Sequence, residues 1–452
     1  MNLLKISSAG VRGIVGRGMN VEIALAFAQA FCTYLEGGTI ALARDSRPSG
    51  LLIRSAVLSG LLAGGSRVVD LGIIPSPTVR IFFGQLGADG AVIVAAGHNP
   101  SHWNALKFLG PSGTYLSALQ GEELLEIYSH GEFQKADWRS IQPIEFNHSA
   151  LDCHRRRILE TFDVPSIRRR KFKVAVDCCN GPCARITPRL LEDLGCQVVA
   201  FNTDLKRPMP HYPNPTPDNM TQLEALVSAA RADVGFAHDA EGERLGIVTD
   251  QGRALSQEHT LALACLIALR SGRSRGPVVT NLSTSRMIDE VAERFGVRTY
   301  RTAVGQAHVT EKTLQVKADL AGEGSGQVIL PWLHPGPDGM AAIALTLEYL
   351  ARSDSSLSQL AHELPAFHMI KESLPFPPDQ LYRRLQRIRI RAGELNGDYR
   401  LDLTDGVKVE NSDEWLQVRA SSTESLLRII AEAREKDKAV QLHRWAREVV
   451  LE

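Results

Sequence analysis

Neither sign of charge is in excess in this chain of 452 residues, which carries 51 lysines and arginines and 51 aspartates and glutamates. A chain without net charge has no overall field that attracts nucleic acid, so we expect no nucleic-acid partner. Long apolar runs are also absent. The most apolar stretch, residues 261–269, is too short to cross a bilayer and predicts a buried helix instead. We therefore expect no membrane contact.

Cysteine is scarce: the chain has seven cysteines, an odd number. Most lie in apolar surroundings, which is typical of a reduced compartment rather than of a disulfide framework. Cys178, Cys179 and Cys183 are close in sequence, but no second cysteine or histidine pair lies at zinc spacing, so we interpret them as buried thiols. The first residues lack the basic and apolar regions of a signal peptide, and we expect a cytoplasmic location.

The length is too great for one ordinary core, so several domains are expected. Strands and helices alternate along most of the chain, which favours α/β domains, and no internal repeat is apparent. We predict domains at residues 1–150, 151–252, 253–365 and 366–452. Predicted strands begin near residues 39, 67, 91, 173, 197, 233 and 277, and predicted helices cover 21–35, 186–194, 261–269, 339–351 and the C-terminal end.

The stretch from residue 91 to residue 108 is the most informative. Its first six residues are small and apolar, which predicts a strand buried on both faces. Gly97, His98, Asn99 and Pro100 then stop the strand and leave a loop at its carboxyl end. Ligands bind at that edge of open α/β sheets, although an ordinary exit from a strand has the same pattern.

A second candidate site is the acidic loop that carries Asp239, Glu241 and Glu243 at alternate positions around Gly242. Carboxylates clustered in this way suit Mg²⁺, which prefers hard oxygen ligands. Charged surface loops are common, however, so the residues alone leave that alternative open.

Three further segments combine polar groups with flexible backbone. Each of them alone is weak evidence for a ligand-binding site. Arg12 lies among three glycines and offers a forked group for an anion. Glu323 and Ser325, separated by a glycine, could bind neighbouring sugar hydroxyls. The last segment places Arg419, Ser421 and Thr423 at alternate positions, as a phosphate site requires. By contrast, the basic residues 155–157 and 168–171 lack interleaved aromatics and are interpreted as a solvated connector.

Together these segments resemble the α-D-phosphohexomutases. The likeness covers residues 8 to about 433 and includes the loop Ala96–Pro100 with Asn104 and Lys107, the Val-Arg-Gly opening, the acidic loop, the Gly-Glu-Gly-Ser-Gly loop and the loop from Arg419. It implies three α/β domains with mixed sheets and a smaller α+β C-terminal domain around a central cleft. It also implies interconversion of hexose 1-phosphate and 6-phosphate through a bisphosphate, with one Mg²⁺ and hexose 1,6-bisphosphate as activator.

The resemblance also implies roles for individual residues. Gly97 and His98 belong to the catalytic loop, and Lys107 and Arg12 are catalytic. The metal ligands are Asp239, Glu241 and Glu243. The substrate is bound by Arg244, Glu323, Ser325, Gln327, Arg419, Ser421 and Thr423.

The chain departs from the family pattern at the residue that matters most. The family carries a serine at position 97, and that serine holds the phosphoryl group, whereas this chain has Gly97. Two aspartates of the metal loop are replaced by Glu241 and Glu243, whose longer arms could reach a metal that has lost its phosphoserine ligand. A histidine of the sugar loop is replaced by Gln327, and a glycine by Ser422.

These features leave two classes of function open. The first is a phosphohexomutase, with glucosamine favoured over glucose and mannose, and the second is a non-catalytic sugar-phosphate-binding protein. Because Gly97 cannot form a covalent phosphoenzyme, we expect turnover to be weak or absent, and we expect Gly97→Ser to raise it. Ser101 follows Pro100, and we expect its side chain to point away from the position of the missing serine, so that it does not replace the nucleophile. A monomer or a homodimer is expected.

Overall fold

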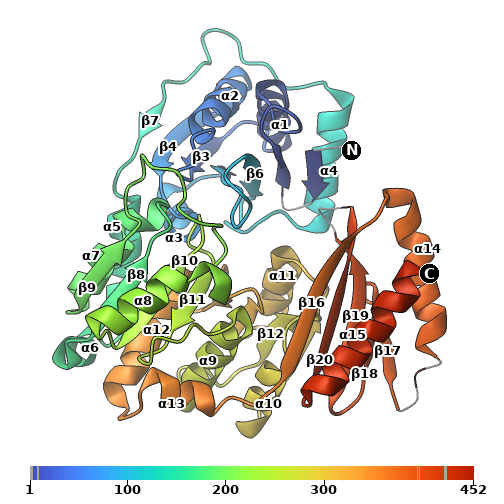
Figure 1. Cartoon of the computed structure of the whole chain (residues 1–452). Helices are drawn as coiled ribbons and strands as arrows, with labels where there is room; N and C mark the ends of the chain where they lie inside the picture. The colour runs from blue at the N-terminus through green and yellow to red at the C-terminus, as the bar shows by residue number, and fades with distance from the viewer. Residues whose placement is uncertain (1–3, 8–9, 394, 396–397, 422–424) are drawn as a thin grey trace.

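The computed structural model describes residues 4–7, 10–393, 395, 398–421 and 425–452. Within these ranges no helix has the length and apolar character needed to cross a membrane. The described chain forms four sheets with helices around them (Figure 1), and three of the sheets mix parallel and antiparallel strands. The fourth is entirely antiparallel. The predicted fold, three α/β domains and a smaller α+β domain, is confirmed.

The first sheet has the strand order β1-β2-β6-β5-β3-β4-β7. Its central strand β5 is buried at every position, as the apolar run predicts, and pairs parallel with β3 and antiparallel with β6. The strands are β1 (Leu4–Ser7), β2 (Gly10–Ile14), β3 (Thr39–Arg44), β4 (Arg67–Ile73), β5 (Gly90–Val94), β6 (Trp103–Leu109) and β7 (Glu145–Phe146), and the helices are α1 (Val21–Tyr34), α2 (Gly50–Ala63), α3 (Ser76–Leu86) and α4 (Ala118–His130).

The second and third sheets have four strands each, in the orders β11-β10-β8-β9 and β13-β12-β14-β15. The second region contains α5 (Ala150–Thr161), α6 (Val164–Arg170), β8 (Lys173–Asp177), α7 (Thr187–Asp193), β9 (Gln197–Phe201), α8 (Thr221–Ala230), β10 (Val234–His238) and β11 (Leu245–Val248). The third contains α9 (Gln257–Arg270), β12 (Val278–Asn281), α10 (Met287–Arg294), β13 (Thr299–Thr302), α11 (Gln306–Val316), β14 (Leu320–Glu323), β15 (Gln327–Ile329), α12 (Gly339–Arg352) and α13 (Leu357–His362).

The fourth sheet has the order β16-β20-β19-β18-β17, and α14 and α15 pack on it. Hydrogen bonds from Ser283 to Gln417 and from Ser285 to Glu432 join this sheet to the third region. Its elements are β16 (His368–Pro375), α14 (Pro378–Ala392), β17 (Arg400–Asp402), β18 (Val407–Glu410), β19 (Glu414–Ala420), β20 (Leu426–Ala433) and α15 (Lys436–Leu451).

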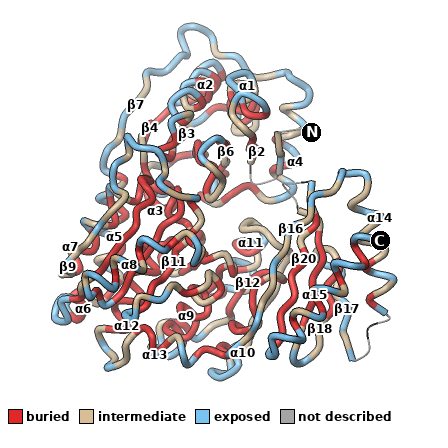
Figure 2. Tube along the Cα trace, viewed as in Figure 1, coloured by how far each residue is buried: buried red, intermediate tan, exposed pale blue. Residues whose placement is uncertain are grey.

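One apolar core extends through the second and third regions. It includes side chains of α6, β8, α9 and α12, and the buried segments of these elements form one continuous interior in Figure 2. The predicted helix at residues 261–269 lies in this core, where every one of its residues is buried. The first and fourth regions have cores of their own. The predicted domain bounds stay a prediction.

The basic residues interpreted as a solvated connector are helical instead. They lie on α5 and α6, and Arg155 forms ion pairs with Asp193 at 2.8 Å and with Asp152 at 3.0 Å. These basic residues are exposed except for Arg155, with Lys171 directly after α6, so the segment is solvated on this side. On the other faces of the two helices, Ile158 and Ile167 belong to the shared core.

Candidate functional site

A cavity of about 260 Å³ opens where the first three regions meet. The strand ends and loops that line it come from β2, β5, β6, the acidic loop and the segments around α11 and β15. Most of the residues singled out from the sequence meet here, namely Arg12, Gly97, His98, Lys107, Glu241, Glu243, Arg244, Glu323 and Gln327. Segments far apart in the chain therefore form one candidate site.

The sheet pairing explains why Lys107 and Arg12 lie near the Gly97 loop. On β6, Lys107 is opposite Ile93 of β5 on one side and opposite Gly10 of β2 on the other. Arg12 follows Gly10 by two residues, so both positions belong to the same face of β2. The sheet thus brings an ammonium and a guanidinium group beside the loop that follows β5.

Arg47, a residue that was not predicted from the sequence, holds the Gly97 loop in place. Its guanidinium donates hydrogen bonds of 2.7 Å to the carbonyl oxygens of Gly97, Asn99 and Pro100, and its Nε donates to Asp45 at 2.9 Å. Arg47 is buried. The signal in the sequence is the pair Asp45 and Arg47 directly after β3, at the same sheet edge as the Gly97 loop.

We expect Arg47→Lys to destabilise the protein by about 1–3 kcal/mol, the cost of leaving a buried polar group unsatisfied. Lysine keeps a charge near Asp45, but a single ammonium cannot reproduce the fork that reaches three carbonyl oxygens. Thermal unfolding checks this, with the exposed Arg17→Lys as the matched control. Equal melting temperatures for the two variants would show that the hydrogen bonds from Arg47 to the Gly97 loop do not stabilise the protein.

The acidic loop is not arranged as a metal-binding triplet. Asp239 turns its Oδ1 into the loop, where it accepts hydrogen bonds from the backbone N–H groups of Glu241, Gly242 and Glu243 at 3.3, 2.7 and 3.0 Å. Among the described residues no group of three His, Cys, Asp or Glu side chains is positioned to hold a metal ion. Joint coordination of a metal by Asp239, Glu241 and Glu243 would require these side chains to leave their present contacts, and it stays a prediction.

Glu241 and Glu243 are instead neutralised by cations of the first region. Lys107 Nζ contacts Glu241 Oε1 closely and lies 3.3 Å from Glu243 Oε2. Arg80 on α3 forms a close ion pair with Glu243, and Tyr115 donates a hydrogen bond of 3.0 Å to the same carboxylate. The ammonium of Lys107 thus occupies the position between two carboxylates that a metal ion would need.

These contacts decide whether Mg²⁺ fits. The oxygens of Glu241 and Glu243 already accept hydrogen bonds from Lys107, Arg80 and Tyr115, and Ser76 donates to Glu241 Oε2 at 2.9 Å. Burial tends to raise the pKa of Glu243, but Lys107 and Arg80 outweigh burial and lower it. At Glu241 burial outweighs Lys107 and raises the pKa to about 8. With all of these partners in place, the residues do not fit a resident Mg²⁺ as they stand.

The Glu241 carboxylate occupies space that a side chain at position 97 would need. Gly97 has φ +55°, a left-handed conformation that L-residues rarely adopt. A Cβ placed on Gly97 would lie 2.5 Å from Glu241 Oε1 and 4.0 Å from Lys107 Nζ. Because of this contact, the expectation that Gly97→Ser alone raises turnover is corrected, since Glu241 must first withdraw.

Positive charge converges on His98. Burial lowers the pKa of this imidazole well below its usual value, and Arg244, Arg12, Lys107 and Arg428 lower it further. His98 is therefore neutral at physiological pH, and the cavity around it has the charge that a phosphate needs. Arg428 was not selected from the sequence, because nothing in the β20 pattern separates it from an ordinary strand residue.

Glu323 and Gln327 of the predicted sugar loop line the same cavity, whereas Ser325 is not among its described lining residues. Glu323 accepts hydrogen bonds from Asn281 Nδ2 at 2.6 Å and from the Gly305 N–H at 3.2 Å. In the described part of the chain, the buried Ser325 Oγ and Gln327 Oε1 have no hydrogen-bond partner. Buried polar atoms are ordinarily paired, so these two point to a polar ligand.

The predicted phosphate loop is described only in part. Arg419 is buried, its Nε lies 3.3 Å from Asp405, and its Nη1 donates to the Ala420 carbonyl at 3.0 Å. The Ser421 N–H donates to the Leu426 carbonyl at 2.9 Å. Neither Arg419 nor Ser421 is among the described residues that line the cavity, and Thr423 and Ser422 lie outside the described residues.

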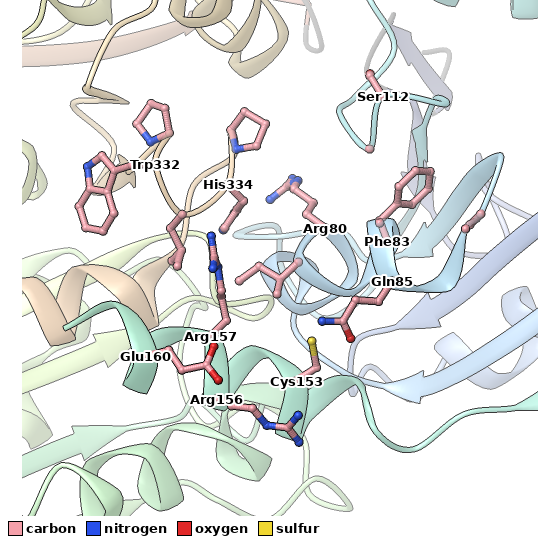
Figure 3. Close-up of a pocket in the computed structure, with 18 of the residues that line it drawn as sticks. Arg80, Phe83, Gln85, Ser112, Cys153, Arg156, Arg157, Glu160, Trp332 and His334 are labelled. Carbon is pink, nitrogen blue, oxygen red and sulfur yellow. The ribbon is translucent and has the colours of Figure 1, made fainter.

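A second, larger hollow of about 760 Å³ lies behind Arg80. Figure 3 shows Arg80 and His334 on its upper side, with Cys153 and the basic side chains of α5 below. It contains none of the residues predicted from the sequence. Arg80 belongs to its wall and also pairs with Glu243, which lines the smaller cavity.

The comparisons with known proteins all indicate the same family. Models described as Phosphoglucomutase/phosphomannomutase, alpha/beta/alpha domains I, II and III and C-terminal domain, match residues 4–135, 154–252, 256–367 and 382–450. A "probable phosphoglucosamine mutase" of Methanopyrus kandleri is 34% identical over 439 residues, covering 96% of this chain and 95% of its own length.

Two further proteins extend the comparison. A "phosphoglucomutase/phosphomannomutase" of Thermococcus kodakarensis is 33% identical over 441 residues, covering 95% of this chain and 94% of its own length. The crystal structure of a phosphoglucomutase/phosphomannomutase family protein from Burkholderia thailandensis superposes with a TM-score of 0.85 at 26% identity. That alignment covers 98% of this chain and 97% of the other.

Proposed function

Because this chain belongs to the phosphoglucomutase/phosphomannomutase family, we propose that it interconverts the 1-phosphate and 6-phosphate of a hexose through a bisphosphate. Its relatives are phosphoglucosamine mutases and phosphoglucomutases, and the chain is an intramolecular phosphotransferase of that class. Glucosamine is the favoured sugar, a choice supported by the names of several relatives.

One observation carries the proposal, the convergence of Arg12, Lys107 and Arg244 on a cavity that also contains the polar groups of the sugar loop. Phosphoryl transfer depends mainly on positioned charge, and these three cations supply it. Lys107 serves as the acid and base that exchanges a proton with the sugar hydroxyl. Glu323, Ser325 and Gln327 bind the hydroxyls of the ring.

A second candidate, a non-catalytic sugar-phosphate-binding protein, is favoured by Gly97 and by Gln327, which stands where the family has a histidine. No covalent phosphoenzyme can form on a residue without a side chain. Ser101 does not replace it, because this residue is exposed and is not among the described residues that line the cavity.

Turnover and binding assays on the full chain separate the two candidates. Glucosamine 1-phosphate and glucose 1-phosphate are each supplied with glucose 1,6-bisphosphate, and the 6-phosphate is measured by a coupled assay. A phosphohexomutase forms 6-phosphate from one of them. Binding by calorimetry without any product would favour the non-catalytic protein, and neither binding nor product would contradict both candidates.

We expect Arg419→Ala to weaken hexose phosphate binding by about 2–4 kcal/mol, as for a charged hydrogen-bond partner that is removed. The proposed role of the loop from Arg419, with Ser421 and Thr423, is to hold the phosphate that does not react, which requires Arg419 to exchange its contact with Asp405 for the ligand. Calorimetric titration checks this, with the exposed Arg400→Ala as the control. Unchanged affinity would exclude the loop from the site.

The remaining assignments follow from the family. We propose hexose 1,6-bisphosphate as the activator, and we propose that Mg²⁺ binds only in competition with Lys107. All seven cysteines are free thiols, which supports the proposed cytoplasmic location. A monomer or a homodimer stays a prediction.

A further inference from the structure

We propose that the Glu241 carboxylate takes the place of the missing serine as the phosphoryl acceptor and forms an acyl phosphate during turnover. This inference rests on the proposed phosphohexomutase function and names the group that would carry out its covalent step. It concerns a residue that the resemblance to the family assigns to the metal.

The position of Glu241 Oε1 is the first observation. This atom lies 2.5 Å from where a Cβ on Gly97 would be, so it occupies the space of the absent side chain. Both residues line the cavity that contains Arg12 and Arg244. An aspartate at position 241 would withdraw the carboxylate by about 1.5 Å, one carbon–carbon bond, and would leave that space empty. The longer side chain of Glu241 therefore fills the space that the absent side chain of Gly97 leaves.

The surroundings of Glu241 also suit a nucleophile. Ser76 fixes Oε2 with a hydrogen bond of 2.9 Å and, through its N–H, holds the Glu241 backbone carbonyl at 3.0 Å. The other oxygen, Oε1, contacts Lys107 and lies on the cavity side of the carboxylate, next to Gly97. Carboxylates are established acceptors of phosphoryl groups in covalent catalysis. Ser76 holds one oxygen, and the other reacts once it exchanges its contact with Lys107 for the phosphoryl group.

The step balances without a metal or a redox partner. A lone pair of Glu241 Oε1 attacks a phosphorus atom of hexose 1,6-bisphosphate, the new O–P bond forms, and the bond from phosphorus to the sugar oxygen breaks. The sugar oxygen takes a proton from the Lys107 ammonium and leaves as the hydroxyl of a monophosphate. In the reverse direction the hydroxyl of a hexose monophosphate returns the proton to Lys107 and attacks the acyl phosphate, which regenerates the carboxylate.

Borohydride trapping tests this on the full chain. The protein is incubated with labelled glucose 1,6-bisphosphate and quenched, and half of the sample is reduced with borohydride, which converts an acyl phosphate to an alcohol but leaves phosphoserine and phosphohistidine unchanged. Peptide mass spectrometry then locates both the label and the reduced residue. We expect reduction at Glu241 in the wild type and in the exposed control Glu160→Gln, and its loss in Glu241→Gln.

The other outcomes have distinct meanings. Glu241→Asp keeps the charge and should also lose the reduced residue, which tests the position of the carboxylate if Glu241→Gln does not fold. Label on His98 or on a serine would overturn the proposal and identify another acceptor. Conversion of hexose phosphate with no reducible group would overturn it and leave the proposed function intact. Absence of label, conversion and binding would overturn both.

Discussion

The double variant Gly97→Ser/Glu241→Asp is expected to form a phosphoserine and to turn over hexose 1-phosphate at least about 100-fold faster than Gly97→Ala/Glu241→Asp. This gain in rate is much smaller than the loss in kcat that follows removal of the serine nucleophile from a serine hydrolase. Glu241→Asp withdraws the carboxylate that lies 2.5 Å from the new Cβ, and the serine hydroxyl then enters the space next to Lys107. Rates with glucose 1,6-bisphosphate as activator and mass mapping of the phosphorylated residue measure the effect.

The single variants isolate the steric part of this expectation. Gly97→Ser alone should not exceed the wild type, because its side chain meets Glu241 Oε1 and because φ +55° strains any L-residue by about 1–3 kcal/mol. Gly97→Ala/Glu241→Asp adds the same Cβ without a hydroxyl, so it carries the same strain. If Gly97→Ser turned over substrate as fast as the double variant, the Glu241 carboxylate would not be what prevents a serine at position 97 from reacting.

Much of the architecture could be predicted from the sequence because it depends on local apolar patterns. The first four of the six apolar residues before Gly97 belong to β5, which is buried on both faces, and the apolar helix at 261–269 lies in the interior. The charge of residues 155–157 and 168–171 indicated a solvated segment, and most of these residues are exposed, but their charge gave no sign of the apolar residues on the opposite faces of α5 and α6. Burial depends on all faces of a helix, and the charged face alone does not decide it.

The site was harder to predict because its contacts join residues far apart in the chain. Arg80 and Glu243 are 163 positions apart, and Lys107 and Glu241 are 134 apart. Spacing within the acidic loop suggested three convergent carboxylates, yet Asp239 forms a local turn with the backbone that follows it. Short-range hydrogen bonds of this kind are typical of aspartate, and they compete with any role of the side chain as a ligand.

Lys107→Met is expected to have two opposite effects, a loss of turnover by about 10²–10⁴-fold and a gain in Mg²⁺ affinity. The loss follows because methionine cannot exchange a proton with the sugar hydroxyl, and general acid–base catalysis contributes a factor of this size. Methionine keeps an unbranched apolar stem of similar length, so the packing against Tyr115, whose ring centre is 5.6 Å from Lys107 Nζ, changes little.

The gain in metal affinity has an electrostatic cause. In the wild type Mg²⁺ must displace an ammonium that pairs with both Glu241 and Glu243, an attraction of about 4 kcal/mol for unit charges at 4 Å near a protein surface. Removing the ammonium leaves the Glu241 carboxylate without a charge partner, while Arg80 still neutralises Glu243. We therefore expect Mg²⁺ to bind Lys107→Met at least about tenfold more tightly, a difference of about 1.4 kcal/mol.

Calorimetric titration of Mg²⁺ into the wild type, Lys107→Met and the exposed control Lys135→Met measures this directly, without substrate. The control should match the wild type, because Lys135 lies on the surface. Equal Mg²⁺ affinity in all three proteins would show that Lys107 does not occupy the cation position between Glu241 and Glu243. Tighter Mg²⁺ binding together with unchanged turnover would show that Lys107 replaces the metal's charge but is not the group that exchanges the proton.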